Sequence, residues 1–333
     1  MSALPAHPRV LVTGGAGFIG SHLVERLLAA GGRVMVVDDL STGRASNLDA
    51  ARAAHGDRLE FVHSPVAEAM PRLAGRPFDA VYHLAAAVGV RLVIESPAAS
   101  AERNVADTAE VLRFASRAGA ATLIASSSEV YGKGVRSPFR EEDDISFGPP
   151  TVARWSYGLS KAIDEHLAIA HAATTGLPTV VTRFFNTVGP RQRARWGMVL
   201  PRFVDAALAG RPLEVHGSGA QVRCFCDVRD VVGALPALLA RAGRGHAVFN
   251  VGTDVPISII DLARLVVRTL ASPSPIVTVP YDRAFGPGFE DLEVRIPDVT
   301  RVREAIGFRP AIALADTVRD LAAERARGAE AAA

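Results

Sequence analysis

Short apolar runs alternate with longer segments of helical periodicity along the first 185 residues of the chain. Apolar runs of strand length predict strands at residues 10–12, 33–37, 59–63, 79–84, 121–126 and 179–184. Between them, apolar residues spaced for one helix face predict helices, of which the clearest are 21–30, 97–118 and 154–175. Strands that alternate with helices favour an α/β fold with a parallel, doubly wound sheet.

The pattern changes near residue 185, where glycine and proline begin to divide the chain into short pieces. We expect residues 1–185 to form a nucleotide-binding domain and residues 186–333 a smaller α/β domain that carries the substrate site. The division is predicted to be interleaved. A helical pattern at 231–241 and an apolar run at 248–251 indicate that the segment near 228–252 returns to the main sheet.

A glycine-rich turn links the first predicted strand to the first predicted helix. Its glycines are Gly14, Gly17 and Gly20, and the next strand ends in an acid, Asp38, which lies 24 residues after Gly14. This arrangement is typical of dinucleotide binding, with the pyrophosphate on the helix N-terminus and the carboxylate on the adenosine ribose. A carboxylate at Asp38 repels a 2′-phosphate, so NAD is favoured over NADP, although the nearby Arg44 argues in the opposite direction.

Composition narrows the class of protein further. Apolar residues make up 49% of the chain and charged residues 22%, and the formal net charge is +2. Because the basic residues are scattered, neither nucleic acid nor a membrane surface is expected as a partner. No apolar run approaches the length of a membrane span, no signal peptide is recognised, and the nine histidines lack ligand spacing. We therefore expect a cytoplasmic protein without a metal site.

Two residues on the helix predicted at 154–175 suggest acid–base chemistry. Tyr157 and Lys161 are four residues apart and share one helix face. An ammonium beside a phenol lowers the pKa of the phenol and makes the phenolate available as a base. Such a pair also arises by chance in many helices, but Lys161 is one of only two lysines in the chain. The preceding strand ends in serines and Glu129, and on a strand Ser127 and Glu129 share a face.

Several motifs together resemble the extended short-chain dehydrogenases/reductases that act on nucleotide sugars, also called the NAD-dependent epimerase/dehydratase family. They are the Gly-x-x-Gly-x-x-Gly turn, Ser-Ser-Ser-Glu-Val-Tyr-Gly at 126–132, Arg-Trp-Ser-Tyr-Gly-Leu-Ser-Lys at 154–161, Arg-Phe-Phe-Asn-Thr-Val-Gly-Pro-Arg at 183–191 and Arg-Ile-Pro-Asp at 295–298. The resemblance implies a Rossmann-type fold and an enzyme that first oxidises the sugar C4 hydroxyl. It further implies that Tyr157 is the base, Lys161 holds the nicotinamide ribose and Ser127 completes the triad.

The residues after Ser127 distinguish members of the family. The 4,6-dehydratases have an Asp-Glu pair there, whereas this chain has Ser128-Glu129, so dehydration is disfavoured. The UDP-glucuronate decarboxylases have Thr-Ser-Glu, and in them an arginine that corresponds to Arg295 reaches the active site. A guanidinium there can hold a carboxylate with two hydrogen bonds, although a surface salt bridge is the ordinary alternative.

The resemblance therefore implies three sets of site residues. The catalytic set is Ser127, Ser128, Glu129, Tyr157, Lys161 and Arg295. The cofactor-binding set is Gly14, Gly17, Phe18, Ile19, Gly20, Asp38, Asp39, Ala85, Asn104 and Lys161. The substrate-binding set, near the diphosphate and uridine, is Asn186, Arg191 and Arg223.

The favoured function is oxidation of UDP-glucuronate at C4 followed by decarboxylation, which gives UDP-4-keto-pentose, UDP-xylose or both. Two departures from the family pattern matter: Pro65 replaces an Asp near the adenine, and Val93 replaces a Tyr that decarboxylases often have near the sugar. The second departure leaves a UDP-sugar 4-epimerase open as an alternative. A non-catalytic, NAD-sensing protein on the same fold is a further alternative.

Alanine-rich apolar faces on the helices predicted at 97–118 and 154–175 bear on assembly. In the family, the corresponding helices pair two subunits through a four-helix bundle. We therefore expect a homodimer.

Overall fold

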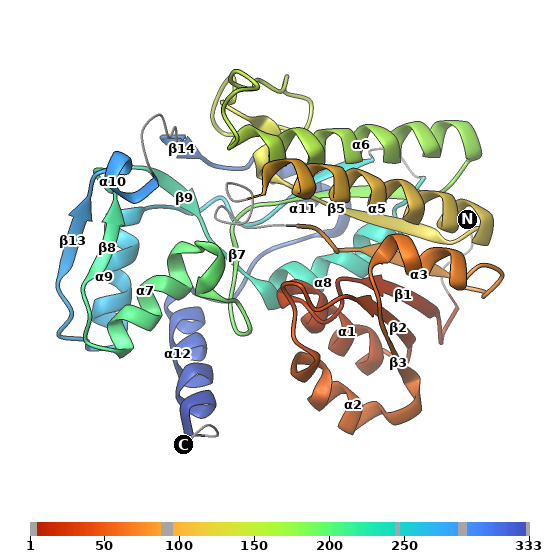
Figure 1. Ribbon diagram of the computed structural model, residues 1–333, viewed down its shortest axis with the longest axis horizontal. Helices are drawn as coiled ribbons and strands as arrows, with labels where there is room; N and C mark the ends of the chain where they lie inside the picture. Colours follow the sequence, from red (N-terminus) through yellow and green to blue (C-terminus); the bar gives the residue numbers. More distant parts are fainter. Residues whose placement is uncertain (1–4, 88–95, 244–246, 286–291, 331–333) are drawn as a thin grey trace.

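A computed structural model describes residues 5–87, 96–243, 247–285 and 292–330 (Figure 1). Its largest sheet has seven parallel strands in the order β11-β6-β5-β4-β1-β2-β3. They are β1 (Arg9–Thr13), β2 (Arg33–Asp38), β3 (Leu59–His63), β4 (Ala80–His83), β5 (Ala121–Ser127), β6 (Thr179–Phe184) and β11 (Val248–Val251). The strand order changes direction between β1 and β4, where ligands bind in folds of this type. The predicted doubly wound α/β fold is confirmed.

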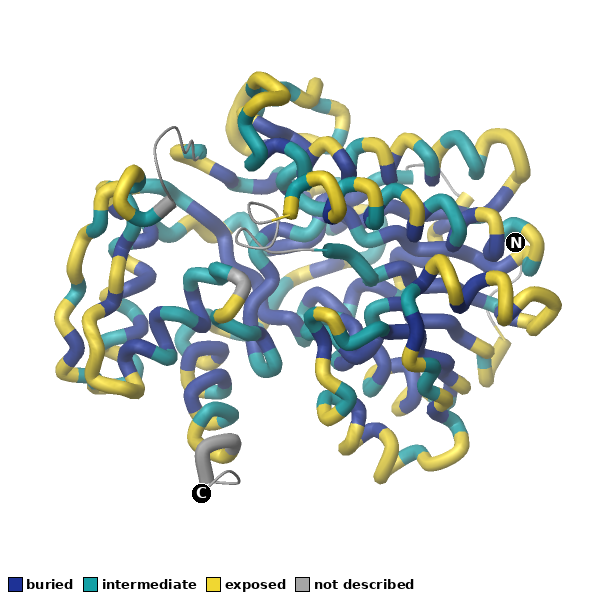
Figure 2. Tube along the Cα trace, viewed as in Figure 1, coloured by how far each residue is buried: buried dark blue, intermediate teal, exposed yellow. Residues whose placement is uncertain are grey.

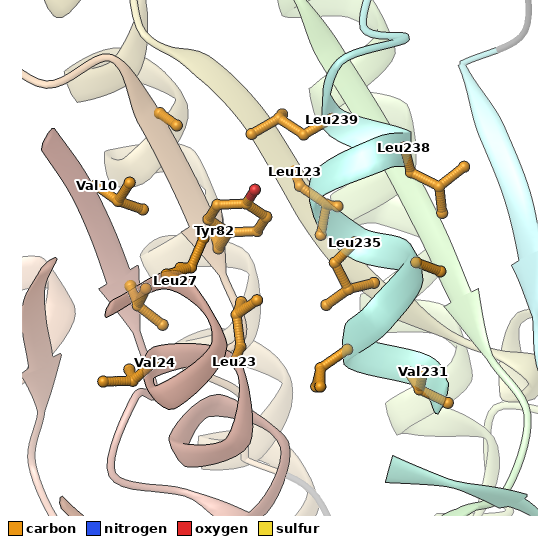
Figure 3. Packing of buried hydrophobic residues seen from close by; sticks show 14 of the residues in the cluster. Val10, Leu23, Val24, Leu27, Tyr82, Leu123, Val231, Leu235, Leu238 and Leu239 are labelled. Carbon is orange, nitrogen blue, oxygen red and sulfur yellow. The ribbon is translucent and has the colours of Figure 1, made fainter. Parts of the chain in front are cut away.

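Helices cover both faces of this sheet because its strands are apolar on both sides. Val10 and Val12 of β1 belong to one buried core, whereas Leu11 between them belongs to the core on the opposite face. The first core contains α1 (Phe18–Ala29) and α8 (Val228–Leu239), which pack against each other as Figure 3 shows. The second contains α3 (Val66–Arg72), α5 (Pro97–Ala118) and α6 (Trp155–Thr175).

Most of the chain after β6 forms a smaller α/β part with its own buried core, built on three short sheets of order β10-β7, β12-β9-β14 and β13-β8. Its strands are β7 (Thr187–Val188), β8 (Leu213–His216), β9 (Val222–Cys224), β10 (Cys226–Asp227), β12 (Pro256–Ser258), β13 (Ile276–Val279) and β14 (Val294–Arg295). Its helices are α7 (Val199–Leu208), α9 (Ile259–Thr269), α10 (Tyr281–Phe285) and α12 (Leu314–Glu330). Two further helices, α2 (Asp49–His55) and α11 (Thr300–Ile306), pack near the main sheet.

Two elements tie this smaller part to the main sheet. Strand β11 pairs with β6 at the edge of the sheet. Helix α8 packs against α1 on the face of the sheet opposite α5 and α6. Figure 2 shows buried segments running from the main sheet into the smaller part, with exposed residues on the outer turns and helix faces. No helix in the described residues is long and apolar enough to cross a membrane.

Helix α3 packs on the second core through one apolar face. It begins at Val66, and Val66, Ala69 and Met70 all point into the second core. These residues have the i, i+3, i+4 spacing of one helix face. The proline at position 71 falls in the last turn, where the helix is about to end.

Candidate active site

A cleft of about 460 Å³ lies where the carboxyl ends of the main-sheet strands meet the smaller C-terminal part. Its walls come from the turn after β1, the ends of β2, β4, β5 and β6, the start of α6, and segments of the smaller part that include β9 and β14. Fifteen of the residues implied as functional line it: Gly14, Gly17, Phe18, Ile19, Gly20, Asp38, Asp39, Ala85, Ser127, Ser128, Glu129, Tyr157, Asn186, Arg223 and Arg295.

The glycine turn at one end of the cleft has no room for side chains. Gly14 has φ +71°, and a Cβ there would lie 2.7 Å from the Ala85 backbone nitrogen. A Cβ on Gly20 would lie 2.1 Å from the Gly14 carbonyl oxygen, so this glycine lets α1 sit directly on the turn. Gly17 is the N-cap residue of α1 and supplies no side-chain cap. The first amides of α1 therefore face the cleft without a side chain over them, as a pyrophosphate requires.

Two adjacent acids, Asp38 and Asp39, stand where β2 ends, and the structure gives them different partners. Asp38 is buried, and its carboxylate accepts hydrogen bonds from the backbone N–H groups of Ala16 (3.0 Å) and Leu40 (2.8 Å). Burial raises the pKa of Asp38, and these two bonds oppose the rise. Asp39 is paired with Arg103 of α5, which together with Ser41 outweighs burial and lowers the pKa of Asp39. Asp38 is thus held against the glycine turn, in position for a ribose.

Asn104 lies behind the cleft wall and is almost fully buried. Its Oδ1 accepts a hydrogen bond from the Ala87 backbone N–H (2.7 Å), and its Nδ2 donates to Ser160 Oγ (3.2 Å). It therefore braces the loop after β4 against α6 and is not among the residues that line the cleft.

Ser127 and Tyr157 both line the cleft, and their side chains are hydrogen-bonded. Ser127 is the last residue of β5, and Tyr157 lies in the first turn of α6. Burial raises the pKa of Tyr157, as do the charges of Glu129 and Asp164, whereas hydrogen bonding with Ser127 lowers it.

The expected effect of Lys161 on Tyr157 is wrong for this structure. Lys161 was predicted to lower the pKa of the phenol, but the pKa of Tyr157 is raised. The main physical reason is burial of the phenol, and the charges of Glu129 and Asp164 add to it. Lys161 itself is paired: its Nζ donates to Asp164 Oδ2 at 2.7 Å, and both side chains are buried. Lys161 does not line the cleft among the described residues.

Glu129 was predicted to share a strand face with Ser127, but it lies in a turn that follows the strand. The strand ends at Ser127, whose Oγ accepts a hydrogen bond from the Glu129 backbone N–H (3.2 Å) and starts a 3₁₀ turn, Ser128–Tyr131. Glu129 Oε1 accepts from Arg295 Nη1 at 2.7 Å, and Arg154 lies 3.7 Å from the other oxygen. Burial opposes ionisation, but the two arginines outweigh it and lower the pKa of Glu129.

The pairing of β14 with β9 places Arg295 directly beside Arg223. Both guanidinium groups are buried and line the cleft with Arg154. Arg223 also donates to the Val222 carbonyl oxygen at 2.8 Å. Three arginines and the single carboxylate of Glu129 leave this part of the cleft with a formal excess of two positive charges. Such an environment suits a ligand that carries more than one negative group.

Comparison with known proteins agrees with this geometry. The profile of the NAD dependent epimerase/dehydratase family matches residues 10–252. The chain belongs to this family. Its relatives include the UDP-N-acetyl-alpha-D-glucosaminuronate decarboxylase of Bacillus cytotoxicus, which is 37% identical over 91% of this chain and 92% of that protein. UDP-glucuronic acid decarboxylase 4 of Arabidopsis thaliana is 36% identical over 92% of this chain and 66% of that longer protein.

Solved structures in the epimerase/dehydratase family share the fold over almost the whole chain. The dTDP-glucose 4,6-dehydratase DesIV of Streptomyces venezuelae, solved with NAD bound, superposes with a TM-score of 0.84, is 29% identical and covers 97% of this chain and 98% of that one. The UDP-glucose 4-epimerase of Thermotoga maritima, solved with UDP-glucose, also has a TM-score of 0.84, with 29% identity and coverage of 96% and 99%. The cofactor is NAD, and the glycine turn, the α1 N-terminus and Asp38 fit it.

The structure separates the residues implied for the substrate nucleotide. Asn186, with φ +27°, lines the cleft, and its Nδ2 donates to the Cys224 carbonyl oxygen at 2.9 Å. Arg191 does not line the cleft, because its guanidinium pairs with Glu25 of α1 at 2.5 Å. The implied substrate role of Arg191 is therefore not supported by its position. Val93, the departure near the sugar, lies outside the described residues.

Two residues that the sequence motifs did not assign pair with residues that they did assign. Arg154 lies three residues before Tyr157 and faces Glu129, and Asp164 lies three residues after Lys161 and pairs with it. For Asp164 the i, i+3 spacing on the helix was a usable signal, since residues at that spacing share a face.

Proposed function

We propose that the protein is an NAD-dependent decarboxylase of UDP-linked uronic sugars, with UDP-glucuronate as the favoured substrate. One observation carries the proposal: Arg295, Arg154 and Glu129 form a charged cluster beside Ser127 and Tyr157. A neutral hexose offers such a cluster only hydroxyl groups, whereas the C6 carboxylate of a uronate matches the charge and the fork of a guanidinium.

Arg295 is the residue proposed to hold the sugar carboxylate. It is about 6% exposed, and one of its nitrogens is used by Glu129. Its Nε is buried without a hydrogen-bond partner among the described residues, which is costly unless a ligand supplies one. Asn186 and Arg223 are proposed to contact the diphosphate and uridine end of the substrate.

The chemistry that these residues support begins at C4 of the sugar. Ser127 donates a hydrogen bond to the C4 oxygen, and Tyr157 removes the proton of that hydroxyl. NAD, when bound, supplies the hydride acceptor for the hydrogen on C4. Because Tyr157 starts with a raised pKa, Ser127 and the charges around the bound substrate must lower it for this step.

Oxidation places a ketone at C4, β to the carboxylate at C6. The bond from C5 to C6 then breaks, its electron pair passes into the C4 carbonyl as an enolate, and CO₂ leaves. Ser127 and Tyr157 stabilise the developing negative charge on the C4 oxygen by hydrogen bonding. Protonation at C5 gives the UDP-4-keto-pentose, and return of the hydride to C4 with a proton to the C4 oxygen gives UDP-xylose.

A second uronate has specific support. The Bacillus cytotoxicus relative, which matches this chain over nearly its full length, is named for UDP-N-acetylglucosaminuronate. That sugar carries the same C6 carboxylate and the same C4 hydroxyl, so the cluster around Arg295 suits both. The two substrates differ at C2. The 4-epimerase alternative uses the same Ser127 and Tyr157 but needs no carboxylate cluster.

Mass spectrometry of the products tests the proposal. The protein is incubated with NAD and, separately, with UDP-glucuronate and UDP-N-acetylglucosaminuronate, with Tyr157→Phe as the inactive control. Loss of one CO₂ from either sugar, abolished by Tyr157→Phe, supports decarboxylation, and the product mass distinguishes ketone from pentose. An isomer of unchanged mass would show an epimerase instead. NAD binding without turnover of these sugars or of neutral UDP-hexoses would favour the NAD-sensing alternative.

We further propose a homodimer formed through a four-helix bundle of α5 and α6 from two subunits. The two helices pack side by side on one face of the sheet (Figure 1). Three large apolar side chains of α6, Leu159, Ile163 and Ile169, are 37%, 48% and 43% exposed. Ile163→Asp should give a monomer by size-exclusion chromatography with light scattering. Ile145→Asp, at an equally exposed isoleucine outside the two helices, is the matched control and should leave the dimer intact.

The cytoplasm is proposed as the site of action from the state of the two cysteines. Cys224 and Cys226 are both free and buried. Burial raises the pKa of the Cys224 thiol to about 12 and also raises that of Cys226, so neither is a reactive thiolate. Unpaired, inert thiols are common in reducing compartments.

A further inference from the structure

Asn250 of β11 is a fully buried polar residue that the proposed chemistry does not use. Its Oδ1 accepts a hydrogen bond from the Tyr131 hydroxyl at 2.7 Å, and its Nδ2 donates to the carbonyl oxygens of Phe139 (3.0 Å) and Asp298 (3.2 Å). A carbonyl oxygen can only accept, so the amide nitrogen must face these two groups. The side chain of Asn250 therefore has one orientation and joins three segments that are far apart in the sequence.

The backbone of Asn250 is also held firmly. Strand β11 is the edge strand of the main sheet, so its outer backbone groups need partners other than a strand. The Asn250 N–H donates to Glu141 Oε1 at 2.8 Å, and the Val248 carbonyl oxygen accepts from Arg301 Nη1 at 3.2 Å. On its inner side the strand pairs with β6. The Asn250 side chain therefore starts from a fixed point at the sheet edge.

The side chain of Asn250 reaches Arg295 through the three residues that follow the arginine. Phe139 pairs with this segment by two backbone hydrogen bonds of 2.8 Å, one from its N–H to the Ile296 carbonyl oxygen and one from the Asp298 N–H to its own carbonyl oxygen. Asn250 Nδ2 donates to both carbonyl oxygens at this junction, those of Phe139 and Asp298. Arg295 is therefore held by the pairing of β14 with β9 and, on its C-terminal side, by this junction.

The other end of the Asn250 amide is attached to the turn that carries Glu129. Tyr131 closes that 3₁₀ turn, and burial raises the pKa of its phenol to about 12, so the hydroxyl keeps the proton that it donates to Asn250. The Tyr131 ring packs against Phe139, with ring centroids 4.8 Å apart. Glu129 and Arg295 pair at 2.7 Å. Asn250 is thus attached to the segments that carry both members of this ion pair.

We infer that Asn250 is a positioning residue for Arg295: its amide nitrogen holds the junction of Phe139 and Asp298 and so fixes how the guanidinium enters the cleft. Neither Asn250 nor Tyr131 is among the described residues that line the cleft, so neither is a catalytic residue. The inference rests on the proposed function in taking Arg295 as the group that binds the sugar carboxylate. Because that contact consists of hydrogen bonds of fixed geometry, a small displacement of Arg295 weakens it more than contacts elsewhere in the cleft.

The experiment compares the binding of UDP-glucuronate and UDP-glucose, which differ at C6, by calorimetry with saturating NAD. Every protein carries Tyr157→Phe, so that neither ligand is consumed. The parent should bind UDP-glucuronate about 100-fold more tightly than UDP-glucose, and Arg295→Gln should remove most of this preference. Asn250→Leu, which removes both N–H donors of the amide, should lower the preference about tenfold, whereas the affinities for UDP-glucose and NAD should stay within about threefold of the parent.

Two control variants separate positioning from a general loss of stability. Thr317→Val removes a buried hydrogen bond to Asp227 (2.7 Å) in the smaller part, at residues outside the described lining of the cleft, and should keep the full preference. Tyr131→Phe removes the bond to Asn250 Oδ1 but leaves both Nδ2 bonds, so it should keep the preference within about threefold.

A double variant covers the case in which Asn250→Leu alone fails to fold. Tyr131→Phe/Asn250→Leu removes both partners of the buried hydrogen bond and leaves no unsatisfied hydroxyl, which is far less costly than removing one partner. It should also lower the preference about tenfold, since the bonds from Nδ2 are absent in it.

A folded Asn250→Leu variant that keeps the full preference for UDP-glucuronate would overturn the inference. Equal weakening of UDP-glucuronate, UDP-glucose and NAD would overturn it as well, because a merely structural role damages all three sites alike. A parent protein without any preference for UDP-glucuronate would contradict the proposed carboxylate site itself, and the inference with it. The same titrations therefore distinguish a failure of the inference from a failure of the proposed function.

Discussion

Replacement of Arg295 by glutamine tests the proposed carboxylate site most directly. The guanidinium donates to Glu129 at 2.7 Å and has a further buried nitrogen without a partner among the described residues. A charge-assisted hydrogen bond contributes about 1.5–3 kcal/mol. Two such bonds to the sugar carboxylate therefore contribute about 4 kcal/mol, which corresponds to a loss of about 10³-fold in kcat/KM for UDP-glucuronate.

The same change should lower stability by a smaller amount. Removing one partner of a buried ion pair costs about 3–5 kcal/mol when the other charge is left alone. Glu129 keeps a second cation, Arg154 at 3.7 Å, so we expect about 2 kcal/mol, or a fall of roughly 3 °C in Tm for a protein of this size. The loss of activity would thus greatly exceed the loss of folded protein at 25 °C.

The assay is CO₂ release from UDP-glucuronate labelled at C6, with NAD affinity measured in parallel. Arg301→Gln is the matched control, because Arg301 pairs with Glu142 outside the cleft and should keep normal turnover. NAD affinity should be unchanged in both variants. The assignment of Arg295 would be refuted if the folded glutamine variant released CO₂ within tenfold of the wild-type rate.

Three further predictions follow from contacts of the described residues. Gly20→Ala should abolish NAD binding, measured by the rise in Tm on adding NAD, because its Cβ would lie 2.1 Å from a carbonyl oxygen of the glycine turn; Gly233→Ala in α8, where the nearest atom is 3.9 Å away, should bind NAD normally. Arg191→Ala should leave KM for the UDP-sugar within about twofold in steady-state assays, since its side chain pairs with Glu25, and a tenfold rise would return it to the substrate site. Because the pKa of Glu129 is lowered in the folded state, its ionised form stabilises the protein above its ordinary pKa of 4.5, and this contribution is lost as pH falls through the folded value. Urea unfolding should therefore show a shallower loss of stability on acidification in Glu129→Gln, and parallel pH curves would contradict this.

The sequence by itself determined the fold class and the cofactor end of the site. Runs such as those of β1 and β2 are apolar on both faces, a pattern that only a sheet covered on both sides can bury. The glycine spacing is equally local, since the turn, the start of α1 and the acid after β2 all lie within 30 residues. The strand pattern and the glycine turn can be predicted from sequence because each depends on residues that are close together in the chain.

The tertiary structure decided what surrounds the reacting groups. Arg295 meets Glu129 across 166 residues of sequence, and the pairing of β14 with β9 fixes that contact. The same folding carries Arg191 to Glu25 of α1 and away from the cleft, although its motif implied a substrate role. The pairing of Arg295 with Glu129 and that of Arg191 with Glu25 cannot be predicted from the spacing of residues in the sequence. Segments that are distant in the chain come into contact only when the core packs.

The ionisation of Tyr157 depends on both the local sequence and the tertiary structure. The spacing of Tyr157 and Lys161 correctly placed them on one helix, but the sign of the effect on the phenol followed from burial and from Asp164. A pKa is set by every charge within several ångströms and by the loss of water, and both depend on packing. Local sequence therefore specified which groups stand on the helix, and the tertiary structure specified how each of them ionises.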